Sequence, residues 1–239
     1  MTNRQSRSVG NLGDILKHAA LVELATLLAA RSARVCQVDT HTFLLHAPAA
    51  DRARWTREVD DLAARHPTYG RYAALERAFF ARTGLYRCSS GLVVDALGPR
   101  RGTTVLGEAN ALTRAELSAQ IASEQLERIT VVDAAAAVDR PPRIPAGGAL
   151  LVHVDPFALS PEDWASFAPA LDAIAARSTE AVFVVYRYSR SARAPWPSAP
   201  RGAVGPVAET RGGPHEVAVY ASATLAAEAA DVCRALGWR

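Results

Sequence analysis

The sequence predicts an α/β fold with a largely parallel, doubly wound sheet. Several segments carry apolar residues at helical spacing, and short apolar runs typical of buried strands lie between them. Strands that alternate with helices along a chain pair in parallel, because each crossover returns the chain to the same end of the sheet. A chain of 239 residues suits one domain with an insertion, or two small domains. We expect a single domain over 1–239 with a helical insertion at 51–84.

The elements follow from the apolar pattern. We expect a helix from Asp14, as its N-cap, to about residue 30, where leucines recur at helical spacing. A short buried strand follows at 34–39. The polar, arginine-rich stretch 51–84 has helical spacing in both halves, which predicts the insertion. Further strands are expected at 103–108, 129–133, 149–155, 181–186 and 216–221, and further helices at 92–97, 112–124, 161–177 (N-cap Ser160) and 224–236.

Two segments rich in proline predict irregular structure. The stretch 139–148 contains too many prolines for a helix or a strand, so we expect a loop. The stretch 189–215 is rich in Arg, Pro and Gly and predicts a loop or a flap. Arg187 and the arginines up to residue 201 alternate with aromatic residues, which suits an RNA strand or an anionic substrate, although a solvated loop has the same composition.

The composition excludes several classes of protein. Hydrophobic residues make up 49% of the chain and charged residues 21%, which excludes disordered, coiled-coil and collagen-like chains. The net charge of +3 is modest for a protein that binds nucleic acid through phosphate contacts. Lys17 is the only lysine, since every other cation is an arginine. We expect Lys17 and His18 in the first turn of their helix, where the helix dipole disfavours a cation. Lys17 is therefore a candidate functional residue, and a surface lysine is the alternative.

The cysteines and the N-terminal residues indicate the compartment. Cys36, Cys88 and Cys233 lie far apart without the spacing of metal ligands, so we interpret them as buried free thiols and expect no metal site. The first residues lack an apolar segment before a small-residue cleavage site, and no run approaches the roughly 18 apolar residues of a membrane span. We therefore expect a soluble, cytoplasmic protein.

Four of the expected strands end in a carboxylate: Asp39, Glu108, Asp133 and Asp155. Ligands bind at the carboxyl ends of strands in open α/β sheets, so these acids are expected to line one crevice. The acid after the second strand suits ribose hydroxyls, the one after the third suits the adenine amine, and the one after the fourth suits the reacting group. The alternative is that each acid caps a helix. A glycine-rich turn, which usually accompanies a nucleotide site, is absent, because 39–48 contains no glycine.

The segment GNLGDILKHAAL at 10–21, followed by a strand and Asp-Thr-His at 39–41, points to a family. It closely resembles the start of the RlmJ-type ribosomal RNA adenine-N6 methyltransferases, in which Gly-Asn-x-x-Asp-x-Leu-Lys-His precedes a strand ending in Asp-Thr-His. Thinner matches follow in the family's order at 86–90, 103–110, 129–134 and 150–157. The resemblance implies a Rossmann-like S-adenosylmethionine methyltransferase fold and N-methylation of an amino group, of the adenine-N6 type in RNA.

The resemblance also implies roles for single residues. Asp155 matches the catalytic aspartate, which holds the target amine so that its nitrogen attacks the methyl group in line. Lys17, expected beside the cofactor site, is the second candidate catalytic residue. This chemistry needs a held amine, an aligned methyl group and a carboxylate for the developing ammonium. The expected cofactor ligands are His18, His41, Ser89, Glu108 and Asp133, and the expected substrate contacts are Asp39, Phe157 and Arg187. We expect His153, inside a buried strand, to be structural.

Two motifs depart from the family's pattern. The glycine turn after Asp-Thr-His becomes Thr-Phe-Leu-Leu at 42–45, and Asp-Pro-Pro-Tyr becomes Asp-Pro-Phe-Ala at 155–158. Bulky side chains at 42–45 lie where the methionine part of the cofactor is expected and predict that S-adenosylmethionine does not bind. Two alternatives stay open. In the first, the fold is repurposed, without the cofactor, for an intramolecular displacement or elimination on a small amine-bearing substrate in secondary metabolism. In the second, the chain is a non-catalytic partner subunit.

Overall fold

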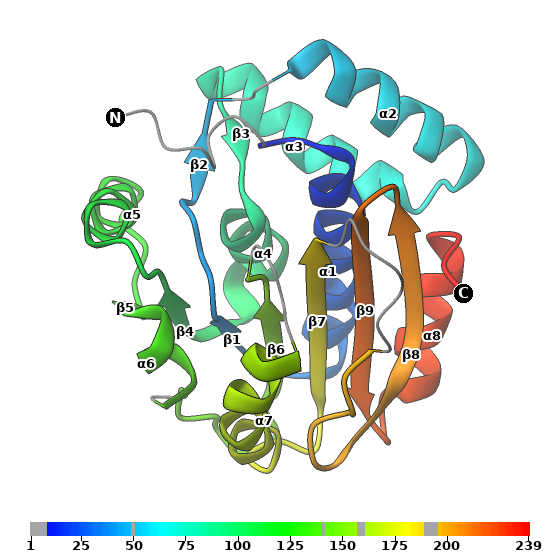
Figure 1. Ribbon diagram of the computed structural model, residues 1–239. Coiled ribbons are helices and arrows are strands. Elements are labelled where there is room, and N and C mark those ends of the chain that lie inside the picture. Colours follow the sequence, from blue (N-terminus) through cyan, green and yellow to red (C-terminus); the bar gives the residue numbers. More distant parts are fainter. Residues whose placement is uncertain (1–8, 49–50, 140–141, 157–160, 189–195) are drawn as a thin grey trace.

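A computed structural model describes residues 9–48, 51–139, 142–156, 161–188 and 196–239 of the chain (Figure 1). Helices and strands alternate along it, as the sequence predicts. The sheet has the strand order β5-β4-β1-β6-β7-β9-β8. Neighbours from β5 to β7 are parallel, and β9 and β8 are antiparallel to their neighbours. The strands are β1 (Val35–Asp39), β4 (Arg101–Gly107), β5 (Ile129–Val132), β6 (Ala149–Val154), β7 (Ala181–Tyr188), β8 (Ala203–Gly212) and β9 (His215–Ser222).

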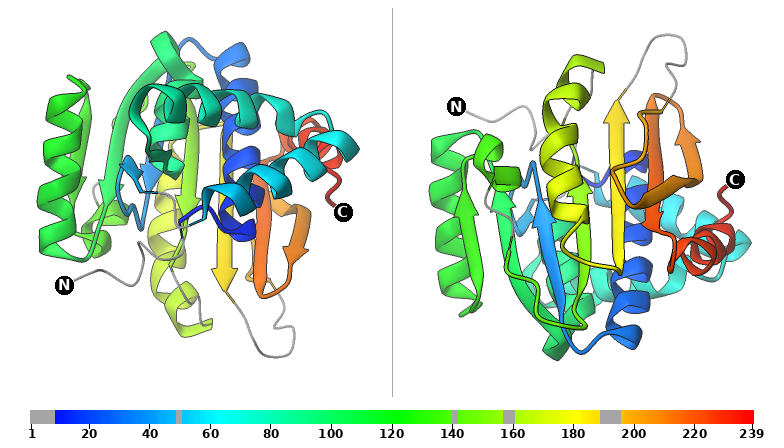
Figure 2. Two further views of the ribbon diagram at one scale, coloured as in Figure 1. Left: turned by 90° about the horizontal axis from the view of Figure 1, so that it is seen from above. Right: turned by 90° about the horizontal axis from the view of Figure 1, so that it is seen from below.

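Helices cover both faces of this sheet. Figure 2 shows α7 (Pro161–Ala175) on one face, and α1 (Leu12–Arg31) with α2 (Arg52–Arg65) and α3 (Tyr69–Thr83) on the other. The strands of the parallel part are continuous apolar runs because both faces are buried, and all six residues of β6 are buried. The remaining helices are α4 (Ser89–Leu97), the 3₁₀ turn η2 (Gly98–Arg100), α5 (Ala111–Ser123), α6 (Ala134–Asp139), α7 (Pro161–Ala175) and α8 (Ala226–Ala235).

The insertion predicted at 51–84 contains two helices, α2 (Arg52–Arg65) and α3 (Tyr69–Thr83). A short antiparallel pair, β2 (His46–Ala47) and β3 (Tyr86–Arg87), joins the chain on either side of it. Trp55, Tyr72 and Tyr86 are fully buried in the same core cluster as α1 (Leu12–Arg31). The insertion is therefore packed onto the sheet's first helix rather than extended into solvent.

The expected loop at 189–215 is partly wrong, because residues 203–212 form the edge strand β8 paired with β9. Glycine and proline are tolerated there, since an edge strand leaves one side of its backbone unpaired and the ladder is interrupted between Val204 and Ala208. The expected N-cap of the first helix is also wrong. Asn11 caps α1, so Lys17 and His18 lie in the second turn. Ser160, the expected cap of α7, lies outside the described residues.

Two smaller expectations have outcomes in the structure. Cys36, Cys88 and Cys233 are free and buried, as predicted. Among the described residues, no helix is long and apolar enough to cross a membrane.

Candidate functional site

The four strand-end acids lie at one edge of the sheet. Because β5, β4, β1 and β6 are parallel neighbours in this order, their carboxyl ends meet at the same edge. Asp133, Glu108, Asp39 and Asp155 follow one another along it. The acids therefore share one edge of the sheet, and that they line one crevice stays a prediction.

The two-residue period of the strands turns several polar side chains toward α1. In β6, Leu150, Val152 and Val154 pack into the core cluster on the α7 face, so His153 points to the opposite face. The register of β1 and β6 pairs Asp39 directly with His153. Sequence reasoning regarded His153 as structural, although its shared parity with Asp155 could have indicated that both point the same way.

The motif Gly10-Asn11-x-x-Asp14 forms the N-terminus of α1. The Asn11 side chain accepts a hydrogen bond from the Asp14 amide at 3.1 Å, and the Asp14 carboxylate accepts one from the Gly10 amide at 2.8 Å. These reciprocal contacts resemble a capping box. Gly10 has a φ of +83°, which glycine adopts without steric cost. The cap therefore fixes the Asp14 carboxylate one helical turn before Lys17.

Lys17 links two carboxylates. Its ammonium donates a hydrogen bond to Oδ2 of Asp155 and lies 3.1 Å from Oδ1 of Asp14. It also lies 4.9 Å from the centre of the Tyr186 ring. Burial alone lowers the pKa of Lys17, but the carboxylates of Asp155 and Asp14 outweigh burial and raise it above its ordinary value. Lys17 is therefore a fixed ammonium ion and neither a base nor a nucleophile.

Asp155 is the least compensated acid around Lys17. Burial raises the pKa of Asp155. The Lys17 ammonium, which Asp155 shares with Asp14, lowers this pKa but does not outweigh burial. For Asp14, burial also acts upward, but Lys17, His18 and the Gly10 amide outweigh it and lower the pKa. Since both acids share one ammonium, Asp155 is the one that accepts a proton more readily.

Asp39 is fully buried, and both of its carboxylate oxygens accept hydrogen bonds. Its Oδ2 accepts a hydrogen bond from Ser90 at 2.5 Å and from Nδ1 of His153 at 3.0 Å. Its Oδ1 accepts one from the His41 amide at 3.2 Å. Burial acts to raise the pKa of Asp39, but His153, Ser90 and the His41 amide outweigh it and lower the pKa. Asp39 therefore anchors its neighbours as a carboxylate.

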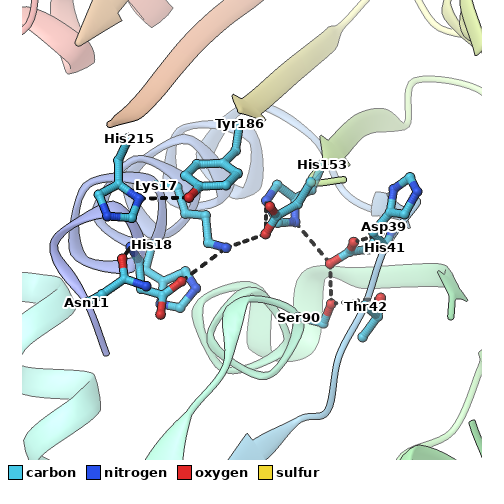
Figure 3. A network of polar contacts seen from close by, with 12 residues as sticks. Asn11, Lys17, His18, Asp39, His41, Thr42, Ser90, His153, Tyr186 and His215 are labelled. Atoms are coloured by element: carbon cyan, nitrogen blue, oxygen red, sulfur yellow. Dashed lines mark hydrogen bonds and ion pairs between the residues drawn. The ribbon is translucent and has the colours of Figure 1, made fainter. Parts of the chain in front are cut away.

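His153 connects Asp39 with Asp155. Its Nε2 lies 3.7 Å from Oδ2 of Asp155, too far for a hydrogen bond, and is buried without a hydrogen-bond partner among the described residues. Figure 3 shows Lys17, His153, Asp39 and Ser90 in one network of polar contacts. Sequence reasoning missed Asp14 and Ser90 as members of this network.

Tyr186 and His215 extend the network along β7 and β9. The Tyr186 hydroxyl and Nδ1 of His215 are 2.8 Å apart. Gly13 lies directly against this histidine, since a Cβ there would come within 2.4 Å of Nδ1 of His215. A glycine at position 13 therefore allows α1 to approach β9.

Glu108 and Asp133 lie at the other part of the edge. Oε1 of Glu108 accepts a hydrogen bond from the Asn110 amide at 2.7 Å, and burial raises the pKa of Glu108. Asp133 accepts hydrogen bonds from Arg114 at 2.9 Å and from the Ala135 amide at 3.1 Å, at the start of α6. Its side chain is 53% exposed. Asp133 therefore makes the helix-capping contact that the sequence offers as the alternative role of these acids, and its side chain still faces solvent.

The turn after β1 is held by the protein itself. The Thr40 amide donates to the His153 carbonyl at 3.0 Å, and the Thr42 amide donates to the Gly107 carbonyl at 2.6 Å. Leu44 and Leu45 pack into the core on the α1 face. The amides that a glycine-rich turn would present to a nucleotide are thus partly used inside the fold.

The remaining predicted site residues have the following surroundings. His41 contacts the Thr40 hydroxyl through Nδ1 at 2.7 Å, and Ser89 is buried at the start of α4. Arg187 donates to Glu216 at 2.5 Å, and its guanidinium lies 4.1 Å from the centre of the Trp196 ring. Phe157 lies outside the described residues.

Comparison with known proteins concerns the fold. No protein-family model matches the chain, and no curated protein matches it. The solved structure of protein LPL1258 from Legionella pneumophila, described with the family model DUF519, has a TM-score of 0.59 at 13% identity and covers 90% of this chain and 86% of its own. The fold is Rossmann-like. An rRNA methylase from Streptococcus thermophilus has a TM-score of 0.45 at 9% identity and covers 86% of this chain and 94% of its own.

Proposed function

We propose that the chain is an S-adenosylmethionine-dependent methyltransferase that acts on an amino group. The observation that carries the proposal is the charge of the network at the end of β6. Asp14 and Asp155 place two carboxylates on the single ammonium of Lys17, and Asp39, paired with His153, adds a third carboxylate to the same network. An anionic excess favours a cationic ligand. The sulfonium cofactor carries positive charge, and the attacking nitrogen of a neutral amine gains positive charge during methyl transfer.

The residues along the sheet edge fit the cofactor by chemistry. Glu108 supplies a carboxylate for the ribose hydroxyls at the second strand of the edge, and the exposed Asp133 supplies one for the adenine amine. His18, His41 and Ser89 are the proposed contacts of the amino-acid part. When bound, S-adenosylmethionine supplies a methyl group on a positively charged sulfur.

The roles of the chain's own residues follow from their charges. Asp155 accepts a hydrogen bond from the substrate amine and orients the nitrogen lone pair, which is the positioning that methyl transfer needs. It then holds the proton that the nitrogen releases, a role supported by its raised pKa. Lys17 holds Asp155 in place through their ion pair and stays protonated.

The substrate class is the finer part of the proposal. The resemblance to adenine-N6 methyltransferases favours an exocyclic amine such as adenine N6, with RNA as the partner. The pairing of Arg187 with Trp196 is compatible with a stacked or anionic partner.

A specific observation favours a second function. The Thr40 and Thr42 amides donate to carbonyls of the fold, so these two amides do not serve a cofactor. In the second function, the same acids hold a small amine-bearing substrate for an intramolecular displacement or elimination.

Calorimetry with S-adenosylmethionine on the full chain separates the two functions. Micromolar affinity supports the methyltransferase, and absence of heat at millimolar cofactor contradicts it. Glu108→Gln should weaken binding at least tenfold, because it removes the charge of the ribose-binding carboxylate. The matched control is Glu116→Gln, which makes the same change on an exposed position of α5 and should leave affinity unchanged.

A further inference from the structure

A buried chain of hydrogen bonds runs from the helical insertion to α1. Nε1 of Trp55 donates to the Tyr72 hydroxyl at 2.8 Å. The Tyr72 and Tyr86 hydroxyls are 2.9 Å apart, and the Tyr86 hydroxyl lies 3.0 Å from Nδ1 of His18. Trp55, Tyr72 and Tyr86 are 0% exposed and His18 is 2% exposed. The indole hydrogen of Trp55 and the hydroxyl hydrogens of Tyr72 and Tyr86 are shielded from solvent and must therefore find acceptors within the protein.

The donor at one end fixes the direction of the whole chain. An indole nitrogen only donates, so the Tyr72 oxygen accepts from Trp55. The Tyr72 hydrogen then needs an acceptor, and among the described residues the Tyr86 oxygen is the one at hydrogen-bond distance. The Tyr86 hydrogen is left to Nδ1 of His18. The reverse order would leave the Tyr72 hydroxyl hydrogen buried without an acceptor in the part of the chain that the structure describes, which folded proteins avoid.

The state of His18 completes the argument. Burial lowers the pKa of His18 to about 3, so the ring is neutral at neutral pH and carries one proton. Since Nδ1 accepts from Tyr86, this proton is on Nε2.

We infer that Trp55, Tyr72 and Tyr86 set the tautomer of His18, so that this histidine carries its proton on Nε2. The three aromatic residues are positioning residues, since they act through His18. That Nε2–H then donates to the carboxylate of the cofactor's amino-acid part rests on the proposed function. Trp55 and Tyr72 of the insertion thereby affect the protonation of His18 beside Lys17, although they are not part of the charged network.

Ring packing keeps the hydroxyls aligned. Trp55 and Tyr86 meet edge to face with centres 6.3 Å apart, and His18 and Tyr72 do so at 6.2 Å. Gly10 lies against both Tyr86 and Trp55, since a Cβ there would be 3.5 Å and 3.7 Å from their rings. The N-terminal cap of α1 therefore packs on the same aromatic group that orients His18.

Nitrogen-15 NMR of the histidine rings tests the tautomer in the ligand-free full chain. The His18 signals, assigned by their loss in His18→Gln, should show a protonated Nε2 and an unprotonated Nδ1 at neutral pH. Protonation of Nδ1, or an average of both tautomers, would overturn the inference. This measurement needs neither a substrate nor a substituted aromatic residue.

Variants test the cause. Tyr86→Phe removes the donor to Nδ1, so we expect mixed tautomers of His18 and about a tenfold loss of S-adenosylmethionine affinity, which corresponds to ~1.4 kcal/mol. Tyr72→Phe should act in the same direction. Tyr69→Phe is the matched control, because Tyr69 is buried on the same helix but its hydroxyl contacts Trp238 at 3.5 Å. A folded Tyr86→Phe that keeps the pure Nε2–H tautomer overturns the inference.

The two proposals fail separately. If the wild-type tautomer is as inferred but S-adenosylmethionine does not bind, the proposed methyltransferase is wrong and the tautomer assignment stands. If the cofactor binds while Nδ1 of His18 is protonated, the assignment is wrong and the proposed function stands.

Discussion

Lys17 and Asp155 are 138 residues apart in the chain and form an ion pair in the buried network. Lys17→Met would leave the partly buried carboxylates of Asp155 and Asp14 without their ammonium, so we expect the free energy of unfolding to fall by about 3 kcal/mol. Urea denaturation measures it. The control is Arg54→Met, which breaks the exposed pair with Glu58 and should cost less than about 1 kcal/mol. Equal losses in the two variants would contradict a special role for Lys17.

The charge of Lys17 alone should not suffice. Lys17→Arg keeps the positive charge, but a planar guanidinium cannot replace a compact ammonium between two carboxylates. We expect the free energy of unfolding of Lys17→Arg to lie between those of the wild type and Lys17→Met. We also expect this variant to bind S-adenosylmethionine more weakly. Wild-type stability and affinity in Lys17→Arg would show that only the charge matters.

Asp155 and Glu108 lie at the same edge of the sheet, but we expect Asp155 to contact the substrate amine and Glu108 to contact the ribose of the cofactor. Asp155→Asn removes the proposed contact to the amine, so calorimetry should give an S-adenosylmethionine affinity within about threefold of wild type, whereas Glu108→Gln should lose at least tenfold, ~1.4 kcal/mol. Methyl transfer to any amine acceptor should be lost in Asp155→Asn. A large loss of affinity in Asp155→Asn would mean that this acid holds the cofactor instead.

The sequence predicts the elements and the acids well because both are local signals. Apolar runs mark the buried strands, and an acid directly after each run marks the shared edge. The N-cap was harder to predict, since both Asn11 and Asp14 are good caps. The choice depends on the Asp14 carboxylate reaching back to the Gly10 amide. The edge strand β8 depends on its pairing with β9, which local composition does not report.

The network shows the same limit. Lys17 stood out as the only lysine and Asp155 by resemblance, but their pairing is a contact between α1 and the end of β6. Ser90 was missed because its partner Asp39 lies on a different element, 51 residues away. Contacts of this kind follow from register and helix placement, which require the assembled sheet.

Glu76 should make stability fall as the pH rises. It is fully buried on α3, and burial raises its pKa to about 7, although the Arg87 amide and Arg52 act in the opposite direction. A folded-state pKa above the unfolded value of about 4.3 means that the folded chain holds a proton which the unfolded chain has released. This stabilisation is complete below the unfolded pKa and is lost as the pH rises through the folded one.

Urea denaturation at pH 5 and pH 8 checks this prediction. Between these values we expect the wild type to lose about 2 kcal/mol relative to Glu76→Gln, in which the group does not titrate. Glu116→Gln, at an exposed position, should follow the wild type. A wild type and Glu76→Gln with parallel pH dependence would contradict the raised pKa.

His18 should give the opposite pH dependence. Burial lowers its pKa to about 3 in the folded chain, so the unfolded chain binds a proton below about pH 6.5 while the folded chain does not. The stability it contributes is present above that value and is lost as the pH falls toward the folded pKa. At pH 4 we expect a loss of about 3 kcal/mol relative to pH 8, which His18→Gln should remove. His66→Gln, at the C-cap of α2, is the control that keeps the loss. Between about pH 4.5 and pH 6.5 the Glu76 and His18 contributions oppose each other, so only the paired variants, and not the wild-type curve alone, separate the two groups.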